Sequence, residues 1–179
     1  MIELRKLALA GLAVAAVAAA TPARAETTLQ EAEAAVKRLQ QAEPGLKRFF
    51  DRAAGYAVFP SVGKGGFIVG GAGGSGYVFE GGKPIGKTSL SQVSVGAQIG
   101  GQAYIEIIFF EDRWALDQFK TGDWAMAAQV SAVAVTAGAA KNAAYNKGVA
   151  VFTLVKGGAM AEASIGGQKF TFEPLGEKK

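Results

Sequence analysis

The sequence contains no cysteine and no histidine. Without cysteine the chain can form no disulfide, thiolate nucleophile or iron–sulfur cluster. Without histidine it has no Ser-His-Asp triad and no imidazole metal ligand. Charged residues are also scarce, at 19% of 179 residues, whereas 50% are hydrophobic and 25 are glycine. This glycine content is about twice the usual share of ~7%, and the overall composition is typical of a globular protein.

The N-terminal segment has the pattern of an export signal. An uncharged run at residues 7–20 follows Arg5 and Lys6, and an Ala-x-Ala sequence ends at Ala25. The run is too short for a membrane span, which needs about 20 residues, so we interpret residues 1–25 as a secretory signal peptide. We expect cleavage after Ala25, export to the periplasm of a bacterial envelope, and a position peripheral to a membrane.

Residues 26–179 are long enough to form one domain with its own core. They contain 16 basic and 14 acidic side chains, so the pI of 9.3 for the whole chain overstates their basic character. This small excess of positive charge gives no support to nucleic-acid binding, and we expect no nucleic-acid partner.

Two helices are predicted at the start of this domain. Thr28 and Glu31 form a capping-box pattern, and apolar residues at helical spacing follow them, which predicts a helix over residues 27–43. Pro44 and Gly45 then interrupt the pattern. We expect a second, short helix over residues 46–54, with Gly55 at its C-cap.

The remainder is dominated by short β-rich runs separated by glycine. Strands are predicted at residues 56–62, 66–69, 76–80, 89–95, 102–110, 149–155, 160–165 and 169–172. A short helix is predicted at residues 112–120, and the uncharged residues 124–140 are predicted to form a buried helix or strand rather than a membrane span. We therefore expect an α+β fold in which N-terminal helices pack on a curved, mostly antiparallel β-sheet or barrel-like structure.

Residues 81–88 match the phosphate-binding pattern GxxxxGK(S/T), and the later segment 105–112, which ends in Glu111 and Asp112, could pass for an acidic strand end that coordinates magnesium. A phosphate-binding loop requires a helix that begins at the Lys-Thr pair, because the helix N-terminus faces the phosphates. The residues after Thr88 instead have the pattern of a strand. We interpret residues 81–88 as a Gly/Pro turn between two strands, and retain a nucleotide hydrolase only as a distant alternative.

The other catalytic patterns are weaker. Residues 71–76 match GxGxxG, but they lead into a strand and not into a helix, so a tight turn or a closely approached backbone is the better interpretation. Glu111 and Asp112 are adjacent carboxylates, and nothing in their spacing indicates a catalytic pair in a cleft. We predict no catalytic residue, no metal site, no cofactor and no enzymatic activity.

The glycine-rich region carries a family resemblance. The ordered segments GYAVFP at 55–60, GKGGF at 63–67, GGAGGSG at 70–76 and VGAQIGGQ at 95–102, followed by IIFF at 107–110, resemble the SYLF domain. The resemblance spans residues 53–172. It implies binding of phospholipids or phosphoinositides, and in some eukaryotic members binding of actin. We expect no actin partner here, because export would separate the chain from actin.

The charge distribution independently favours an anionic membrane. Eight basic and three acidic residues lie between Lys37 and Lys87, so the remainder of the domain is net acidic. Basic residues near an anionic surface contribute about 1 kcal/mol each. The candidate lipid-binding residues are Lys64, Arg48, Arg52, Lys83 and Lys87, with Phe49 and Phe50 as candidates for apolar insertion.

For the two aromatics taken alone, packing in the core is the alternative that we favour. For the function, the alternative is a structural or stress-related periplasmic protein without a specific ligand. The sequence does not determine the oligomeric state.

Overall fold

The computed structural model describes residues 26–65, 69–95, 103–127, 129–156, 165 and 167–176. The expected signal peptide, the strand expected at residues 160–165 except for Ile165, and most of the strand expected at 66–69 lie outside the described residues. Within them, none of the helices is long and apolar enough to span a membrane.

The two N-terminal helices form close to their predicted positions. Helix α1 spans Leu29–Ala42, and its capping box is complete: Thr28 Oγ1 accepts from the backbone N–H of Glu31, and the Glu31 carboxylate accepts from that of Thr28. A 3₁₀ turn η1 (Pro44–Leu46) leads into α2 (Lys47–Arg52). The expected C-cap at Gly55 is wrong: Ala53 caps α2, and Gly55 begins the first strand.

Eight strands form one sheet in the order β5-β8-β3-β2-β1-β4-β7-β6. The strands are β1 (Gly55–Gly65), β2 (Val69–Glu80), β3 (Lys83–Val95), β4 (Ala103–Phe110), β5 (Trp124–Ala125), β6 (Ala132–Ala134), β7 (Val149–Val155) and β8 (Lys169–Pro174). All pairs are antiparallel except β6 with β7. The structure confirms the predicted α+β class with a curved, mostly antiparallel sheet.

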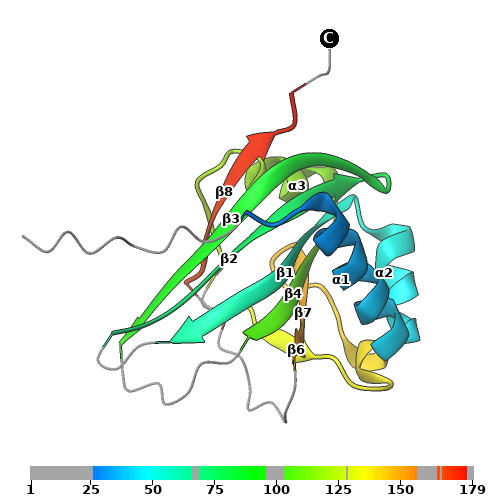
Figure 1. The fold of residues 1–179 in the computed structure, drawn as a ribbon. Coiled ribbons are helices and arrows are strands. Elements are labelled where there is room, and N and C mark those ends of the chain that lie inside the picture. Colours follow the sequence, from blue (N-terminus) through cyan, green and yellow to red (C-terminus); the bar gives the residue numbers. More distant parts are fainter. Residues whose placement is uncertain are drawn as a thin grey trace, which may run out of the picture.

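The curvature is visible in a contact between strands that are not neighbours. β1 and β8 are separated by β2 and β3, and in a flat sheet they would lie about 14 Å apart at ~4.8 Å per strand. The rings of Phe59 on β1 and Phe170 on β8 nevertheless have centroids 5.7 Å apart. The sheet therefore curls into a half-barrel, with the long β2–β3 hairpin along its wall (Figure 1).

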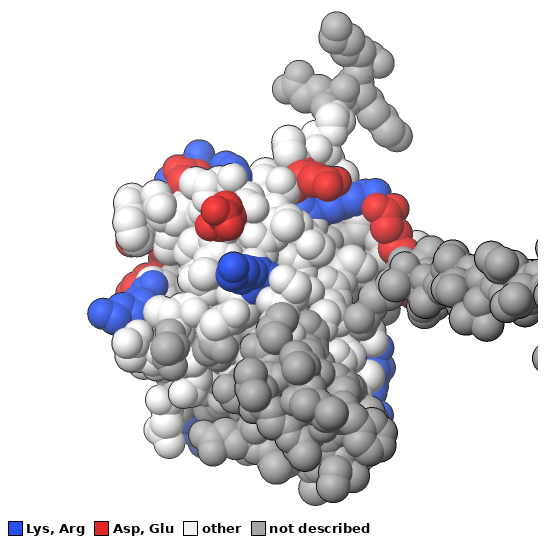
Figure 2. Space-filling model, turned by 90° about the vertical axis from the view of Figure 1, so that its left-hand side faces the viewer, with Lys and Arg blue, Asp and Glu red and all other residues white. Residues whose placement is uncertain are grey.

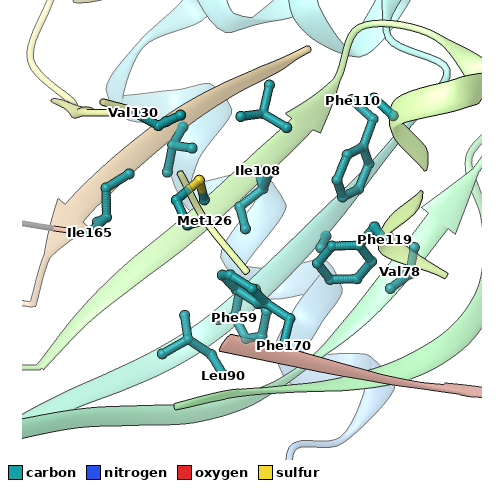
Figure 3. Close-up of a cluster of buried hydrophobic side chains, with 14 of the residues drawn as sticks. Phe59, Val78, Leu90, Ile108, Phe110, Phe119, Met126, Val130, Ile165 and Phe170 are labelled. Carbon is teal, nitrogen blue, oxygen red and sulfur yellow. The ribbon is translucent and has the colours of Figure 1, made fainter. Parts of the chain in front are cut away.

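Both faces of this sheet are covered. One face packs on α1 and α2 through a cluster that includes Leu39, Phe49 and Phe109. The concave face is filled by a second cluster, in which Phe119 of helix α3 (Arg113–Phe119), Met126, Val130 and Ile165 meet the strands (Figure 3). Strand β4 serves both clusters because its side chains alternate between the faces.

The uncharged residues 124–140 do not form the single buried element that the sequence predicted. They contain the short strands β5 and β6 and the start of the 3₁₀ turn η2 (Ala139–Asn142), and several of their described residues are exposed. Met126 and Val130 are buried in the concave core. The apolar composition of this segment is thus explained only in part by burial.

The two glycine motifs have the non-nucleotide structures that the sequence favoured. Gly81 and Gly82 form the β2–β3 turn with φ values of 59° and 76°, and residues 83–88 continue as strand β3 without a helix. Residues 71–76 lie within β2. A Cβ atom at Gly74 would lie 2.8 Å from the carbonyl oxygen of Ser61, which confirms the predicted close approach of two backbones.

Candidate functional site

The predicted basic residues lie in four separate places. Arg48 and Arg52 share one face of α2, because residues four positions apart on a helix are neighbours. Lys83 is exposed at the β2–β3 turn. Lys87 lies on β3 near the beginning of α1, where its ammonium binds the Glu26 carboxylate at 3.1 Å. Lys64 belongs to β1, and its side chain lies outside the described part of the chain.

The two predicted aromatics pack onto the sheet. Phe49 is only 3% exposed, and its ring contacts Phe109, Phe152 and Tyr145. The expectation that Phe49 inserts into lipid is therefore corrected: its side chain is part of the core. Phe50 is half-buried, with its ring edge-on to Tyr56 and Phe109 at 5.1 and 4.8 Å. The sequence pattern did not show which side chains of α2 face the sheet. A helix of six residues stays packed on the sheet only if some of its side chains are buried.

Arg48 and Arg52 line the same pocket, which has a volume of about 350 Å³. Phe49 and Tyr145 contribute aromatic walls, and Glu111 contributes an acidic side chain. Tyr145 and Glu111 were not predicted as site residues. Tyr145 is separated from Arg52 by more than 90 positions in the sequence, and no local pattern indicates that the fold brings them together.

The guanidinium of Arg48 is held in place by the protein. Its Nη2 donates to the carbonyl oxygens of Ala140 and Ala143, each at 2.5 Å, and its guanidinium carbon lies 4.6 Å from the centroid of the Phe49 ring. These carbonyls lie at the end of η2, where the Ala140 oxygen also accepts from the backbone N–H of Ala143 at 3.3 Å. A guanidinium has five N–H donors, so the remaining ones stay available for a ligand.

Arg52 and Tyr145 have unused hydrogen-bonding capacity. Arg52 forms no hydrogen bond or ion pair with any other described residue, and it is exposed. The hydroxyl oxygen of Tyr145 is buried and has no hydrogen-bond partner within the described residues. Burial raises the pKa of Tyr145, and Glu111 adds to this, whereas the charges of Arg48 and Arg52 act in the opposite direction. The hydroxyl thus remains a neutral donor close to two cations.

This arrangement suits an anion that carries several oxygens. A guanidinium binds phosphate or carboxylate oxygens through paired N–H groups, and a buried hydroxyl without a partner gains a hydrogen bond when such an oxygen arrives. Glu111 opposes an anion, so the pocket has a net charge of about +1 and not +2. Nothing in the pocket resembles a nucleophile with an adjacent base.

A second, larger groove of about 400 Å³ runs along α1. It contains two cations, Arg38 and Lys156, and two acids, Glu26 and Glu31. Glu31 is engaged in the capping box and Glu26 in the ion pair with Lys87. Because the acids balance the cations, this groove has less electrostatic preference for an anion than the pocket on α2.

Charge is dispersed elsewhere on the surface. On the face drawn in Figure 2, basic and acidic side chains are interspersed and most of the described surface is uncharged. The described part of this face is not a basic patch. The basic excess that the sequence places between Lys37 and Lys87 is therefore divided among several regions of the molecule.

The structure combines an α+β fold with a pocket that two arginines line. In a comparison with known families, the sequence model of Ysc84, described as "Las17-binding protein actin regulator", matches residues 91–174. This match to a SYLF-family model covers just under half of the chain and confirms the resemblance that the glycine-rich segments predicted. The matched region begins in β3, so α1 and α2 precede it, and Glu111 and Tyr145 lie inside it.

A curated relative gives a similar result. Beta cell expansion factor A from Aeromonas veronii is 36% identical to this chain over 74 residues. The aligned region covers 41% of this chain and 28% of the relative. The chain therefore matches less than a third of that protein's length.

Proposed function

We propose that this protein binds the anionic headgroups of phospholipids in the pocket formed by Arg48, Arg52 and Tyr145. A headgroup phosphate would accept from the free N–H groups of both guanidiniums and from the Tyr145 hydroxyl. The observation that carries the proposal is the buried hydroxyl without a partner beside two cations in an open pocket. The SYLF family, a lipid-binding module, supports the same chemistry. Actin is not part of the proposal, although the family description mentions it.

The proposed location is the surface of a bacterial envelope membrane, reached after export. If residues 1–25 are a signal peptide, we expect the protein purified from the envelope fraction to begin at Glu26. Intact-mass measurement tests this directly. A mass that includes Met1 would contradict both the cleavage and the proposed peripheral position.

Vesicle sedimentation of the chain starting at Glu26 tests the headgroup site. We expect binding to phosphatidylglycerol vesicles at low salt and little binding to phosphatidylcholine vesicles. Arg52→Gln should weaken binding about fivefold, since one basic residue near an anionic surface contributes about 1 kcal/mol. Tyr145→Phe should weaken binding by a similar factor without lowering stability, because the hydroxyl has no partner to lose. Glu111→Gln should strengthen binding.

Lys87→Gln is the matched control, since it changes the charge by the same amount in a different pocket. It should weaken binding less than Arg52→Gln does. Equal losses in the two variants would indicate diffuse attraction without a site. Binding that is unchanged by both Arg52→Gln and Tyr145→Phe would assign the headgroup to another part of the molecule.

A further inference from the structure

One end of the half-barrel combines exposed apolar side chains with unpaired cations. Among the described residues, the large hydrophobic side chains that are exposed are Trp114, at 68%, and Leu175, at 38%. All other large apolar residues in this part of the chain are buried or half-buried. Exposed apolar side chains gain free energy when they move from water to a less polar environment. Two of them at one end of the molecule therefore indicate a contact surface.

A chain of contacts connects Trp114 to Leu175. Trp114 follows Arg113, whose guanidinium forms an ion pair with Glu80 at the end of β2. Glu80 pairs in register with Lys83 across the β2–β3 turn. Leu175 follows the end of β8, and its N–H donates to the carbonyl oxygen of Ile85, two residues beyond Lys83. Both apolar side chains therefore belong to the end of the sheet that contains this turn, which is the upper end in Figure 1.

Two exposed lysines lie at the same end of the sheet, together with the exposed acids Glu111 and Asp112 that precede Trp114. Lys83 is exposed at the β2–β3 turn, and Lys147 is exposed in the turn before β7. Neither has an ion pair with another described residue. The N–H of Glu111 donates to the carbonyl oxygen of Gly148 at 2.9 Å, which places the turn that contains Lys147 beside the start of α3. We call the surface formed by Lys83, Arg113, Trp114, Lys147 and Leu175 the upper-end surface.

This surface is continuous with the proposed headgroup pocket. Glu111 lines the pocket with Arg52, and Trp114 lies only three residues further along the chain. The peptide N–H of Ala54, two residues after Arg52, donates to the carbonyl oxygen of Phe110 at 2.9 Å. The end of α2 and the beginning of α3 are thus joined at the same end of the sheet.

We propose that the upper-end surface is the face that docks on the membrane, with the Trp114 indole inserted among the headgroups and Leu175 beside it. Tryptophan prefers the membrane interface because its ring is apolar while its N–H can stay hydrated, and lysines beside it meet anionic headgroups. The proposal rests on the proposed function, and it supplies the apolar contact that Phe49, as a core residue, does not provide. It also fixes the orientation of the half-barrel, with the upper end toward the lipid.

Tryptophan fluorescence tests the docking face, because the chain has two tryptophans. Trp124 is half-buried and contacts Phe119 and Phe170, so Trp124→Phe leaves Trp114 as the sole indole reporter. With phosphatidylglycerol vesicles we expect a blue shift of Trp114 emission and quenching by brominated acyl chains. Phosphatidylcholine vesicles should produce little change.

Sedimentation of the protein with both tryptophans provides a second measurement that does not depend on Trp124→Phe folding. Trp114→Ala should bind phosphatidylglycerol vesicles about tenfold more weakly, the factor that burying one large apolar side chain supplies. Its thermal midpoint should be unchanged. The control is Gln41→Ala at an exposed position of α1, outside the upper-end surface, which should bind like the parent.

The outcomes separate this inference from the proposed function. If the parent protein binds vesicles while Trp114→Ala binds equally well and the emission does not shift, the headgroup pocket stands and the docking face is wrong. If the parent binds no anionic vesicle, both proposals fail. A Trp114 emission that shifts only with a protein partner and not with vesicles would overturn the membrane assignment.

Discussion

Gly76→Ala should destabilise the protein by about 3 kcal/mol or more, a large part of the 5–15 kcal/mol typical of a domain. Gly76 is buried on β2, and a Cβ atom there would overlap the carbonyl oxygen of Val58 on β1, with the carbonyl carbon only 2.9 Å away. Strand β2 is paired on both sides, to β1 and β3, so it cannot shift without breaking ladder hydrogen bonds. Urea unfolding at equilibrium would measure the loss.

Two other glycines provide graded controls for this prediction. A Cβ atom at Gly82 meets no other atom within 4 Å, but φ is +76°, so Gly82→Ala should cost about 1 kcal/mol of backbone strain. Gly176 has neither close neighbours nor positive φ, so Gly176→Ala should be neutral. If the free energies of unfolding of Gly76→Ala and Gly82→Ala differ by less than about 1 kcal/mol, β1 and β2 can separate at this point.

The sequence predicted those parts of the fold that local patterns encode. The capping box of Thr28 and Glu31 identified α1, and Asp112, which caps α3 by accepting from the N–H of Ala115, lay at the expected helix start. Most strands were found, but β2 was predicted to start at 76 and begins at Val69. Residues 70–74 are four glycines and one alanine, and such a run has no alternation from which a strand could be predicted.

The site could be predicted only in part, for a similar reason. Arg48 and Arg52 share a helix face, which their spacing of four residues shows directly. Tyr145 and Glu111 join them only because β4, β7 and α2 meet at one end of the sheet. Phe49 was a candidate for lipid insertion and proves to be a core residue, because composition alone does not distinguish an apolar side chain that faces the sheet from one that faces solvent.

A second large loss of stability is expected when a buried acidic side chain in the concave core is replaced. Glu106 on β4 is fully buried, and its Oε2 accepts from Nε2 of Gln168, also fully buried, at 3.0 Å. Tyr104 is its neighbour on the same face of β4: burial raises the pKa of Tyr104, and the Glu106 carboxylate adds to this shift. Glu106 is thus part of a polar cluster within the apolar core.

This cluster attaches the segment before β8 to the sheet. The backbone carbonyl oxygen of Gln168 accepts from the N–H of Met126 at 2.8 Å, and its N–H donates to the carbonyl oxygen of Ile165. The Gln168 side chain then reaches β4 from the opposite side of the core. Loss of the contact between Glu106 and Gln168 should therefore loosen the closure of the half-barrel as well as remove one hydrogen bond.

Glu106→Ala should lower the free energy of unfolding by about 3 kcal/mol, because it leaves a cavity and a buried amide N–H without its acceptor. Gln168→Ala should have a similar effect. The double variant should lose clearly less than the sum of the two, with a coupling free energy of about 1–3 kcal/mol, because each single change already removes the shared hydrogen bond. Urea unfolding of the four proteins completes the cycle.

Glu106→Gln distinguishes the role of shape from the role of charge. It keeps the volume and one acceptor oxygen, and it removes a carboxylate whose burial is costly when it is ionised. We expect its stability to equal or exceed that of the parent. If Glu106→Gln instead loses as much stability as Glu106→Ala, the negative charge itself holds the segment before β8 on the sheet.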